Sequence, residues 1–247
     1  MHQPMNVSNV SKIITCQAVV RRWLACKNNI YIKLKHQQPR FTAVLKGYHM
    51  LNKTPIAGAV WEELNCDIVS DVCTISDEAN GNHLSGKDNR FDNFNISNKT
   101  SKTDKNDIIS ISSYRLTSVC SDKSPGNERE IIQEIEKRDS SFEYYSILNC
   151  KRDGEKLFYE WYMIPKDYYL FKMKTLQHKI GQQGKKKGTI VGWSSDYCDI
   201  LFSMSSQLWY KFMVKDIKKY RICSVEIDNS KPKLSYSQIC SLLGDTA

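Results

Sequence analysis

The segment from Asn82 to Lys99 constrains the fold most, because it places two turn signals around a short alternating stretch. Asp88 closes a Ser-Gly-Lys-Asp turn, and Asp92-Asn93 is a second turn signal. The residues that follow alternate apolar and polar side chains, which is the period of a β-strand. One face of this strand carries Phe94, Ile96 and Asn98, and the other carries Asn95, Ser97 and Lys99. The pattern predicts a hairpin that brings Lys99 close to Asp88.

An acid beside a lysine has a known chemical use. A carboxylate such as Asp88 holds a divalent cation, and a lysine such as Lys99 holds a phosphate oxygen or a water molecule. Together these groups form the core of a site for metal-assisted phosphodiester hydrolysis.

Asp88 followed by Ser97-Asn98-Lys99 resembles the PD-(D/E)XK nuclease superfamily, and within it the type II restriction endonucleases. That family has an acid at the end of one strand and an acid-X-Lys sequence on the next. This chain departs from the pattern twice: Ser97 stands at the second acid, and Lys87 replaces the proline before the first. The similarity covers roughly residues 55–117.

The resemblance implies a Mg²⁺-dependent endonuclease that cuts double-stranded DNA at a specific sequence. Asp88 would hold the metal ion, Lys99 would orient the attacking hydroxide, and Ser97 would take the vacated acidic position. Some members of the superfamily that carry Ser-X-Lys draw the missing carboxylate from a neighbouring helix. Such enzymes often dimerise to cut both strands, so a homodimer is one expected arrangement.

A helix expected over residues 55–64 offers a candidate for that carboxylate, because its apolar residues recur at every fourth position. Gly58 followed by Glu62 resembles the early helix of these nucleases, so Glu62 is the first choice for a second metal ligand. Glu63 stays open as an alternative. Adjacent glutamates on a surface helix are commonly just solvated, which is the competing interpretation. A later helix offers three further acids: Glu128, Glu130 and Glu134.

The charge of the chain favours a polyanionic partner, because the net charge is +9 and the isoelectric point is near 9.0. A glycine-flanked lysine run at residues 184–188 predicts a flexible cationic loop that contacts phosphates or is simply solvated. The side chain of Gln207 suits hydrogen bonds to the edge of an adenine base. The preferred interpretation of this position is instead a buried connection between a strand and a helix. The residues that we expect at double-stranded DNA are Arg115, Lys185, Lys186, Lys187 and Gln207.

The remaining periodicity predicts an α/β fold. A helix begins after Asn127, and β-period stretches occur at residues 66–75, 108–116, 142–148, 156–164, 190–193 and 199–204. We expect a restriction-endonuclease-like central mixed sheet flanked by helices, with a β-rich C-terminal half. Residues 108–116 would be the third strand of that sheet. This domain is expected to cover residues 41–247.

Residues 1–40 are expected to form a basic amphipathic helix and a linker at residues 37–39. Residues 17–23, Gln-Ala-Val-Val-Arg-Arg-Trp, resemble a degenerate IQ motif, which binds calmodulin-type light chains. The motif departs from the family pattern at Cys16, Arg22 and Lys27. A calmodulin-like partner for residues 13–27 is therefore one hypothesis, and a peripheral helix with a solvated basic face is the other.

The nine cysteines are unclustered and include no Cys-X₂-Cys, so they predict reduced thiols in an intracellular protein. No apolar run approaches the ~20 residues that cross a bilayer. We therefore expect a soluble, cytoplasmic protein with no membrane partner. The main competing function is a non-catalytic DNA-binding or adaptor protein with a nuclease fold, which the loss of the second acid favours. A basic RNA-binding protein is a third class, although the common RNA-binding signatures are absent.

Overall fold

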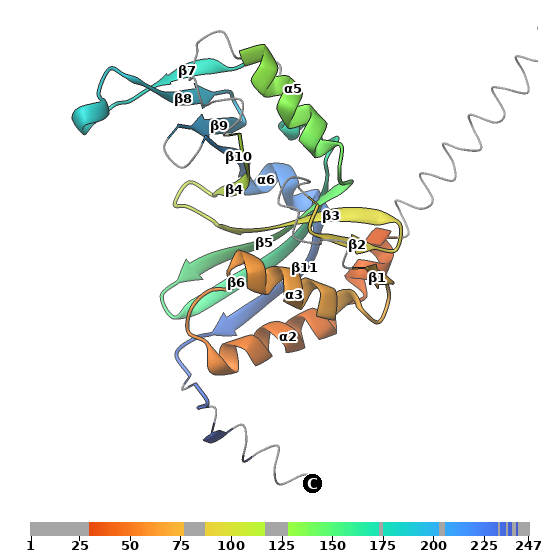
Figure 1. Ribbon diagram of the computed structural model, residues 1–247. Coiled ribbons are helices and arrows are strands. Elements are labelled where there is room, and N and C mark those ends of the chain that lie inside the picture. The colour runs from red at the N-terminus through yellow and green to blue at the C-terminus, as the bar shows by residue number, and fades with distance from the viewer. Residues whose placement is uncertain are drawn as a thin grey trace, which may run out of the picture.

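The computed structural model is a mixed α/β protein with two β-sheets and few helices (Figure 1). It describes residues 30–76, 87–116, 128–172, 175–202 and 206–231, together with residues 233–235, 237, 238 and 241. The α/β class predicted from the sequence is confirmed at this level. The predicted basic helix with its IQ-like residues 13–27 lies outside the described residues.

The larger sheet has six strands and carries the hairpin between Asp88 and Lys99. Strands β3 and β5 run parallel, and the other neighbouring pairs are antiparallel. The β-period stretches predicted at residues 142–148 and 156–164 are confirmed as β5 and β6, which pair as an antiparallel hairpin. In spatial order the strands are β1 (Ile75–Ser76), β2 (Asn89–Phe91), β3 (Phe94–Lys102), β5 (Tyr144–Asp153), β6 (Lys156–Pro165) and β11 (Arg221–Asp228).

The smaller sheet has five antiparallel strands. Residues 108–116 do form a strand, but the prediction that it is the third strand of the central sheet is wrong. This strand pairs with β10 because Ile109 and Ile111 enter the core between the two sheets. In spatial order the strands are β4 (Ile108–Arg115), β10 (Gln207–Met213), β9 (Cys198–Leu201), β8 (Ile190–Ser194) and β7 (Gln177–Ile180).

Helices α2 (Gln38–Leu51) and α3 (Gly58–Val69) pack on one face of the larger sheet, and α5 (Glu128–Asp139) packs on the other with the smaller sheet (Figure 1). Short helical turns complete the described part: α6 (Val214–Ile217), η2 (Tyr169–Phe171), η3 (Gly184–Lys186) and η4 (Lys218–Tyr220).

Successive residues of the central strands enter two different cores. Tyr145 and Ile147 of β5 pack toward α5 and the smaller sheet, whereas Tyr144 and Leu148 pack toward α2 and α3. Burial of both faces explains why these strands are almost continuously apolar.

Helix α3 begins and ends later than the sequence pattern predicts. It starts at Gly58 and continues to Val69, so the predicted strand over residues 66–75 is wrong apart from Ile75, which begins β1. Trp61, Asn65 and Ile68 are buried along one side of the helix. Their spacing is the helical period, which the apolar residues at the end of the segment continue.

The predicted linker at residues 37–39 is wrong at its end: the turn between two helical segments lies at residues 36 and 37, and residues 38 and 39 already belong to α2. The N–H of Gln37 donates to the carbonyl of Leu34 at 3.0 Å, and Pro39 lies in the first turn of α2. Ile30 and Leu34 are buried in the same core as α2, so residues 30–35 pack against the body of the protein. In the part of the chain that the structure describes, no helix is both long and apolar enough to cross a membrane.

Candidate active site

The β2–β3 hairpin forms where the turn signals predict it. Phe91 pairs with Phe94, and Asp92 at the turn has a φ of 51°, a left-handed conformation that aspartate tolerates better than most residues. Strand β2 begins only at Asn89, opposite Ile96. Beyond that point, no described strand pairs with β3 on this side. Asp88 lies at the opened edge.

The carboxylate of Asp88 accepts hydrogen bonds that a neighbouring strand would otherwise satisfy. Its Oδ2 accepts the backbone N–H of Asn98 at 2.5 Å and the hydroxyl of Ser97 at 3.4 Å. The ammonium of Lys99 lies 3.4 Å from the same oxygen. The side chains of Lys99 and Asp88 are 16% and 23% exposed, so the pair is shielded from bulk solvent yet reachable. The predicted approach of Lys99 to Asp88 is confirmed.

Glu62 reaches this pair from helix α3. It is half-buried, and burial raises the pKa of its carboxyl, with the negative charge of Asp88 adding to the rise and the positive charge of Lys99 opposing it. Both charges therefore act on Glu62 across the gap between helix and hairpin. Its neighbour Glu63 is exposed. Of the two glutamates left open by the sequence, Glu62 is the one at the site.

The acids of helix α5 have other surroundings. Glu128 accepts the backbone N–H of Leu176 at 2.9 Å, and Glu134 pairs with Arg138 at 2.6 Å. Glu130 is exposed. These contacts favour Glu62 over the three α5 acids as the source of a second carboxylate.

A buried polar cluster that the sequence analysis missed joins α3 to the sheet next to this site. The side-chain amide of Asn65 donates to Oδ1 of Asn98 at 2.6 Å and to Oγ of Ser146 at 2.8 Å. Trp161 donates to the same Ser146 hydroxyl at 2.9 Å, and Asn98 donates to Asn89. Asn65, Asn98 and Ser146 are all at most 3% exposed. The one sequence feature that points to this cluster is Asn65, a polar residue at a position of α3 where the helical period predicts a buried side chain.

The residues expected at DNA are not gathered around Asp88. Arg115 is exposed at the end of β4, and Lys185, Lys186 and Lys187 are exposed at the tip of the β7–β8 hairpin. Gln207 does not suit base readout, because it is 7% exposed and its amide donates to the carbonyl of Leu208. The smaller sheet buries it where the sequence analysis expected a turn out of the preceding strand.

No protein-family model, no curated protein and no solved structure matches the chain. Assignment of the site therefore depends on the chemistry of Glu62, Asp88, Ser97 and Lys99 themselves.

The two carboxylates fit a Mg²⁺ ion. Magnesium is commonly held by one or two carboxylates together with water and substrate phosphate oxygens. Glu62 and Asp88 supply that number. Burial is the main cause of the raised pKa of Glu62, and the negative charge of Asp88 adds a smaller repulsion that a bound cation would relieve. Within the described ranges, no group of three or more His, Cys, Asp or Glu side chains gathers as a ligand set. A cation held by these two carboxylates would complete its coordination with water and substrate oxygens.

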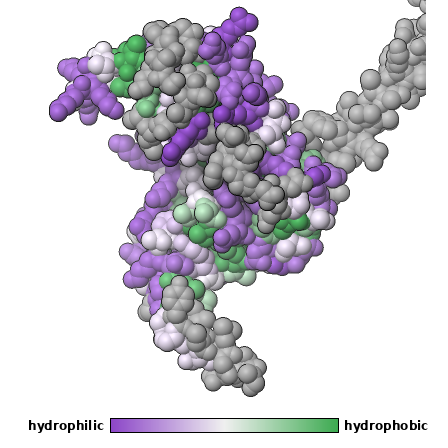
Figure 2. All heavy atoms as spheres, viewed as in Figure 1, coloured by the Kyte–Doolittle hydropathy of each residue, from purple (hydrophilic) through white to green (hydrophobic). Residues whose placement is uncertain are grey.

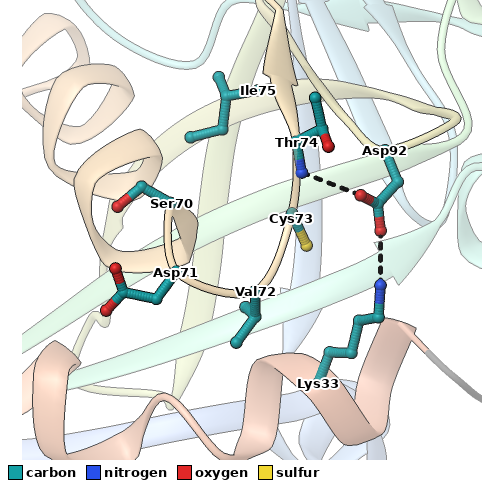
Figure 3. Close-up of a pocket in the computed structure, with 8 residues that line it drawn as sticks. All are labelled: Lys33, Ser70, Asp71, Val72, Cys73, Thr74, Ile75 and Asp92. Atoms are coloured by element: carbon teal, nitrogen blue, oxygen red, sulfur yellow. Dashed lines mark hydrogen bonds and ion pairs between the residues drawn. The ribbon is translucent and has the colours of Figure 1, made fainter.

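A hollow of about 580 Å³ beside the hairpin turn has a different character (Figure 3). Lys33 lies 2.8 Å from Oδ2 of Asp92, whose Oδ1 accepts the N–H of Thr74 at 2.9 Å. Burial raises the pKa of the Cys73 thiol to about 11, which keeps it protonated at neutral pH. The hollow is therefore lined by charges that are already paired and by an unreactive thiol. The contacts of Asp92 with Lys33 and Thr74 stabilise the turn between β2 and β3.

Proposed function

We propose that this chain is a Mg²⁺-dependent endonuclease that hydrolyses phosphodiester bonds of double-stranded DNA at a specific sequence, with a PD-(D/E)XK, restriction-endonuclease-like site. One observation carries the proposal. Glu62 from α3, Asp88 before β2 and Lys99 on β3 act on one another electrostatically at a single shielded place. Two acids and a lysine are the groups that this chemistry needs.

Each residue has a role that follows from its surroundings. Asp88 and Glu62 would hold the cation, and Lys99 would donate hydrogen bonds to the attacking water or to a phosphate oxygen. When bound, Mg²⁺ supplies an acidified water and neutralises the charge that develops on the phosphate. Lys99 already lies against a carboxylate, so its ammonium is held in place before substrate arrives.

Ser97 replaces the second acid of the family pattern, and its side chain still contacts the site. Its side chain is buried, 1% exposed, and its hydroxyl donates to Asp88. In this proposal Ser97 orients the Asp88 carboxylate, and Glu62 on the neighbouring helix replaces the second acid. This is the arrangement that the resemblance implies for members with Ser-X-Lys.

The charge of the chain supports a nucleic acid as substrate. A net charge of +9 attracts a phosphate backbone and speeds its association. Arg115 and the lysines at 185–187 are exposed and suit phosphate contacts, which position a duplex without reading its sequence.

The deciding experiment is cleavage of mixed-sequence plasmid and linear DNA with Mg²⁺ or Mn²⁺. We expect discrete fragments from the wild type, loss of at least about 100-fold of the activity in Lys99→Ala, and full inhibition by EDTA. Lys102→Ala is the matched control, because Lys102 is an exposed lysine on the same strand. Intact DNA in every reaction, together with a mobility shift that shows binding, would overturn catalysis.

That result would favour the second candidate, a non-catalytic DNA-binding or adaptor protein that keeps a nuclease fold. The observation behind it is that the position of the second acid holds a buried serine. In this case a calmodulin-like protein would be the partner of residues 13–27. Pull-down with calmodulin, using the full chain and a variant with Arg21 and Arg22 changed to alanine, tests that part separately.

A further inference from the structure

The β7–β8 hairpin extends from the smaller sheet as a two-stranded arm (Figure 1). Its strands pair from Gln177 opposite Ser194 to Ile180 opposite Ile190, with a register shift after Lys179. Every residue from Gln182 to Ile190 is exposed. A solvent-exposed extension of this kind adds little to the core, so its sequence is free to serve contact with a partner.

The tip of the arm is a hydrogen-bonded turn. Gly188 donates to the carbonyl of Gly181 at 3.0 Å, and Gly181 donates to Thr189 at 2.9 Å. A Cβ on Gly181 would lie 2.1 Å from the carbonyl oxygen of Lys186, so only glycine fits this approach. These hydrogen bonds close the tip around the turn η3, which contains Lys185 and Lys186 and is followed directly by Lys187.

The charge of the arm is not balanced within the arm itself. From Gln177 to Trp193 the sequence has lysines at 179, 185, 186 and 187 and no acid. Lys179, near the base, pairs with Asp199 at 2.6 Å. Among the ion pairs of the described residues, none involves the three lysines of the tip. Positive charge is therefore concentrated at the far end, where Figure 2 shows a hydrophilic surface.

An exposed apolar pair lies directly behind these lysines. Ile180 and Ile190 are 42% and 40% exposed and oppose each other across the two strands. An isolated exposed isoleucine needs no explanation. Two that face each other beneath a cationic turn form a small apolar contact surface with charge at its rim.

We propose that the β7–β8 arm enters a groove of duplex DNA, with Lys185, Lys186 and Lys187 on phosphates and the Ile180–Ile190 pair against sugars and base edges. The inference rests on the proposed function for the choice of a DNA duplex. The major groove of B-form DNA admits a two-stranded ribbon, and apolar side chains of groove-binding proteins pack on base steps. The major groove of double-stranded RNA is too deep and narrow for this contact. An anionic membrane is the competing surface for a basic and apolar patch.

The test measures equilibrium binding of the full chain to a fluorescent 30-base-pair duplex in EDTA, over a range of salt concentrations. In K185A/K186A/K187A we expect weaker binding and a shallower slope of log affinity against log salt, by ~0.9 for each phosphate that the variant no longer neutralises. The matched control is K35A/K46A/K53A, which removes equal charge from exposed lysines on the α2 side of the molecule. A control slope equal to that of the wild type is expected.

The apolar pair is tested with I180S/I190S. We expect several-fold weaker binding at an unchanged salt slope, because no charge is removed. G181A, which disturbs the tip without changing its charge, is expected to weaken binding too. Circular dichroism and urea unfolding of each variant check that the body of the protein remains folded.

These outcomes separate the arm from the catalytic proposal. Reduced binding in the arm variants supports the arm even if the wild type cleaves nothing. Binding equal to that of the wild type in all arm variants overturns it even if DNA is cleaved. Wild-type binding to vesicles of phosphatidylserine, with no binding to the duplex, would also overturn it.

Discussion

Nζ of Lys99 lies 3.4 Å from Oδ2 of Asp88, although eleven positions separate the two residues in the chain. The β2–β3 hairpin folds them together, and because β2 begins only at Asn89, the edge of β3 beyond Ile96 is open for the acid. The backbone N–H of Asn98 then fixes the carboxylate against that edge. Local structure thus holds Lys99 and Asp88 next to each other, and Glu62 is added to the site by helix α3.

Glu62 is expected to reduce stability at neutral pH. Its pKa is raised above the ordinary value of 4.5, so the folded state holds its proton more tightly than the unfolded state. The destabilisation is absent below pH 4.5 and grows as the pH rises through the raised pKa. Glu62→Gln should therefore have a higher free energy of unfolding than the wild type at pH 7.5, and this advantage should disappear near pH 4. Urea unfolding at both values measures it.

Glu63→Gln is the control for this prediction, because Glu63 is exposed on the same helix. It should follow the wild type at both pH values. An advantage of Glu62→Gln that is the same at pH 4 and pH 7.5 would contradict an electrostatic origin.

Mg²⁺ is expected to stabilise the folded protein through the same two carboxylates. A ligand at ten times its dissociation constant adds about 1.4 kcal/mol to the free energy of unfolding when it binds only the folded state. Thermal unfolding of the wild type should therefore move to higher temperature with increasing Mg²⁺. The shift should vanish in Asp88→Asn and Glu62→Gln and persist in Glu63→Gln. An equal shift in all four proteins would mean that the ion acts elsewhere.

Asn65→Ala should destabilise the protein by about 1–3 kcal/mol, because Oδ1 of Asn98 would lose its buried donor and the hydroxyl of Ser146 would keep only the one from Trp161. Ser146→Ala should have an effect of similar size. The double variant should be destabilised by less than the sum of both, since the two changes remove one shared hydrogen bond. Urea unfolding of the four proteins gives the coupling, with Asn106→Ala as an exposed control. Strict additivity would show that the cluster does not act as a unit.

The pair of Lys33 and Asp92 predicts a pH dependence of opposite sign to that of Glu62. Burial alone would raise the pKa of Asp92, but hydrogen bonds from Lys33 and from the N–H of Thr74 lower it overall. The stabilisation is present above the ordinary pKa of 3.8 and is lost as the pH falls through the depressed value. Asp92→Asn should thus be less stable than the wild type at pH 7, by about 1 kcal/mol or less for a pair this exposed.

Asparagine keeps the acceptor for Thr74 and tolerates the positive φ of this turn, so Asp92→Asn isolates the charge. The difference from the wild type should shrink between pH 4 and pH 2 in guanidinium unfolding. A difference that persists undiminished at pH 2 would assign the effect to turn geometry instead.

Local patterns were enough to predict the hairpin and most strands. Turn chemistry at Asp92-Asn93 and alternation from Phe94 onward depend on neighbouring residues, and so do the apolar runs of β5 and β6. The same reasoning failed over residues 66–75, because a short apolar run is compatible with a strand and with the end of a helix. Val69 is the last residue of α3 there, and Ile68 and Val69 are both buried in the core.

The assignment of strands to sheets is a second feature that local sequence patterns did not predict. The strand at residues 108–115 is evident from its alternation, but its pairing with β10 joins residues about a hundred positions apart. Gln207 was misjudged for the same reason, since β10 buries it against a strand far away in sequence.

The sequence by itself determined that Asp88 and Lys99 meet, since a tight turn and a strand of period two leave no other arrangement for that segment. Only the tertiary structure decided which acid accompanies them. Glu62 faces the pair and Glu63 faces solvent because α3 is seated on the sheet by Trp61 and by the hydrogen bonds of Asn65 to Asn98 and Ser146. Those contacts span 33 and 81 positions. No local periodicity encodes contacts at such separations, and the rotation of the helix about its axis depends on them.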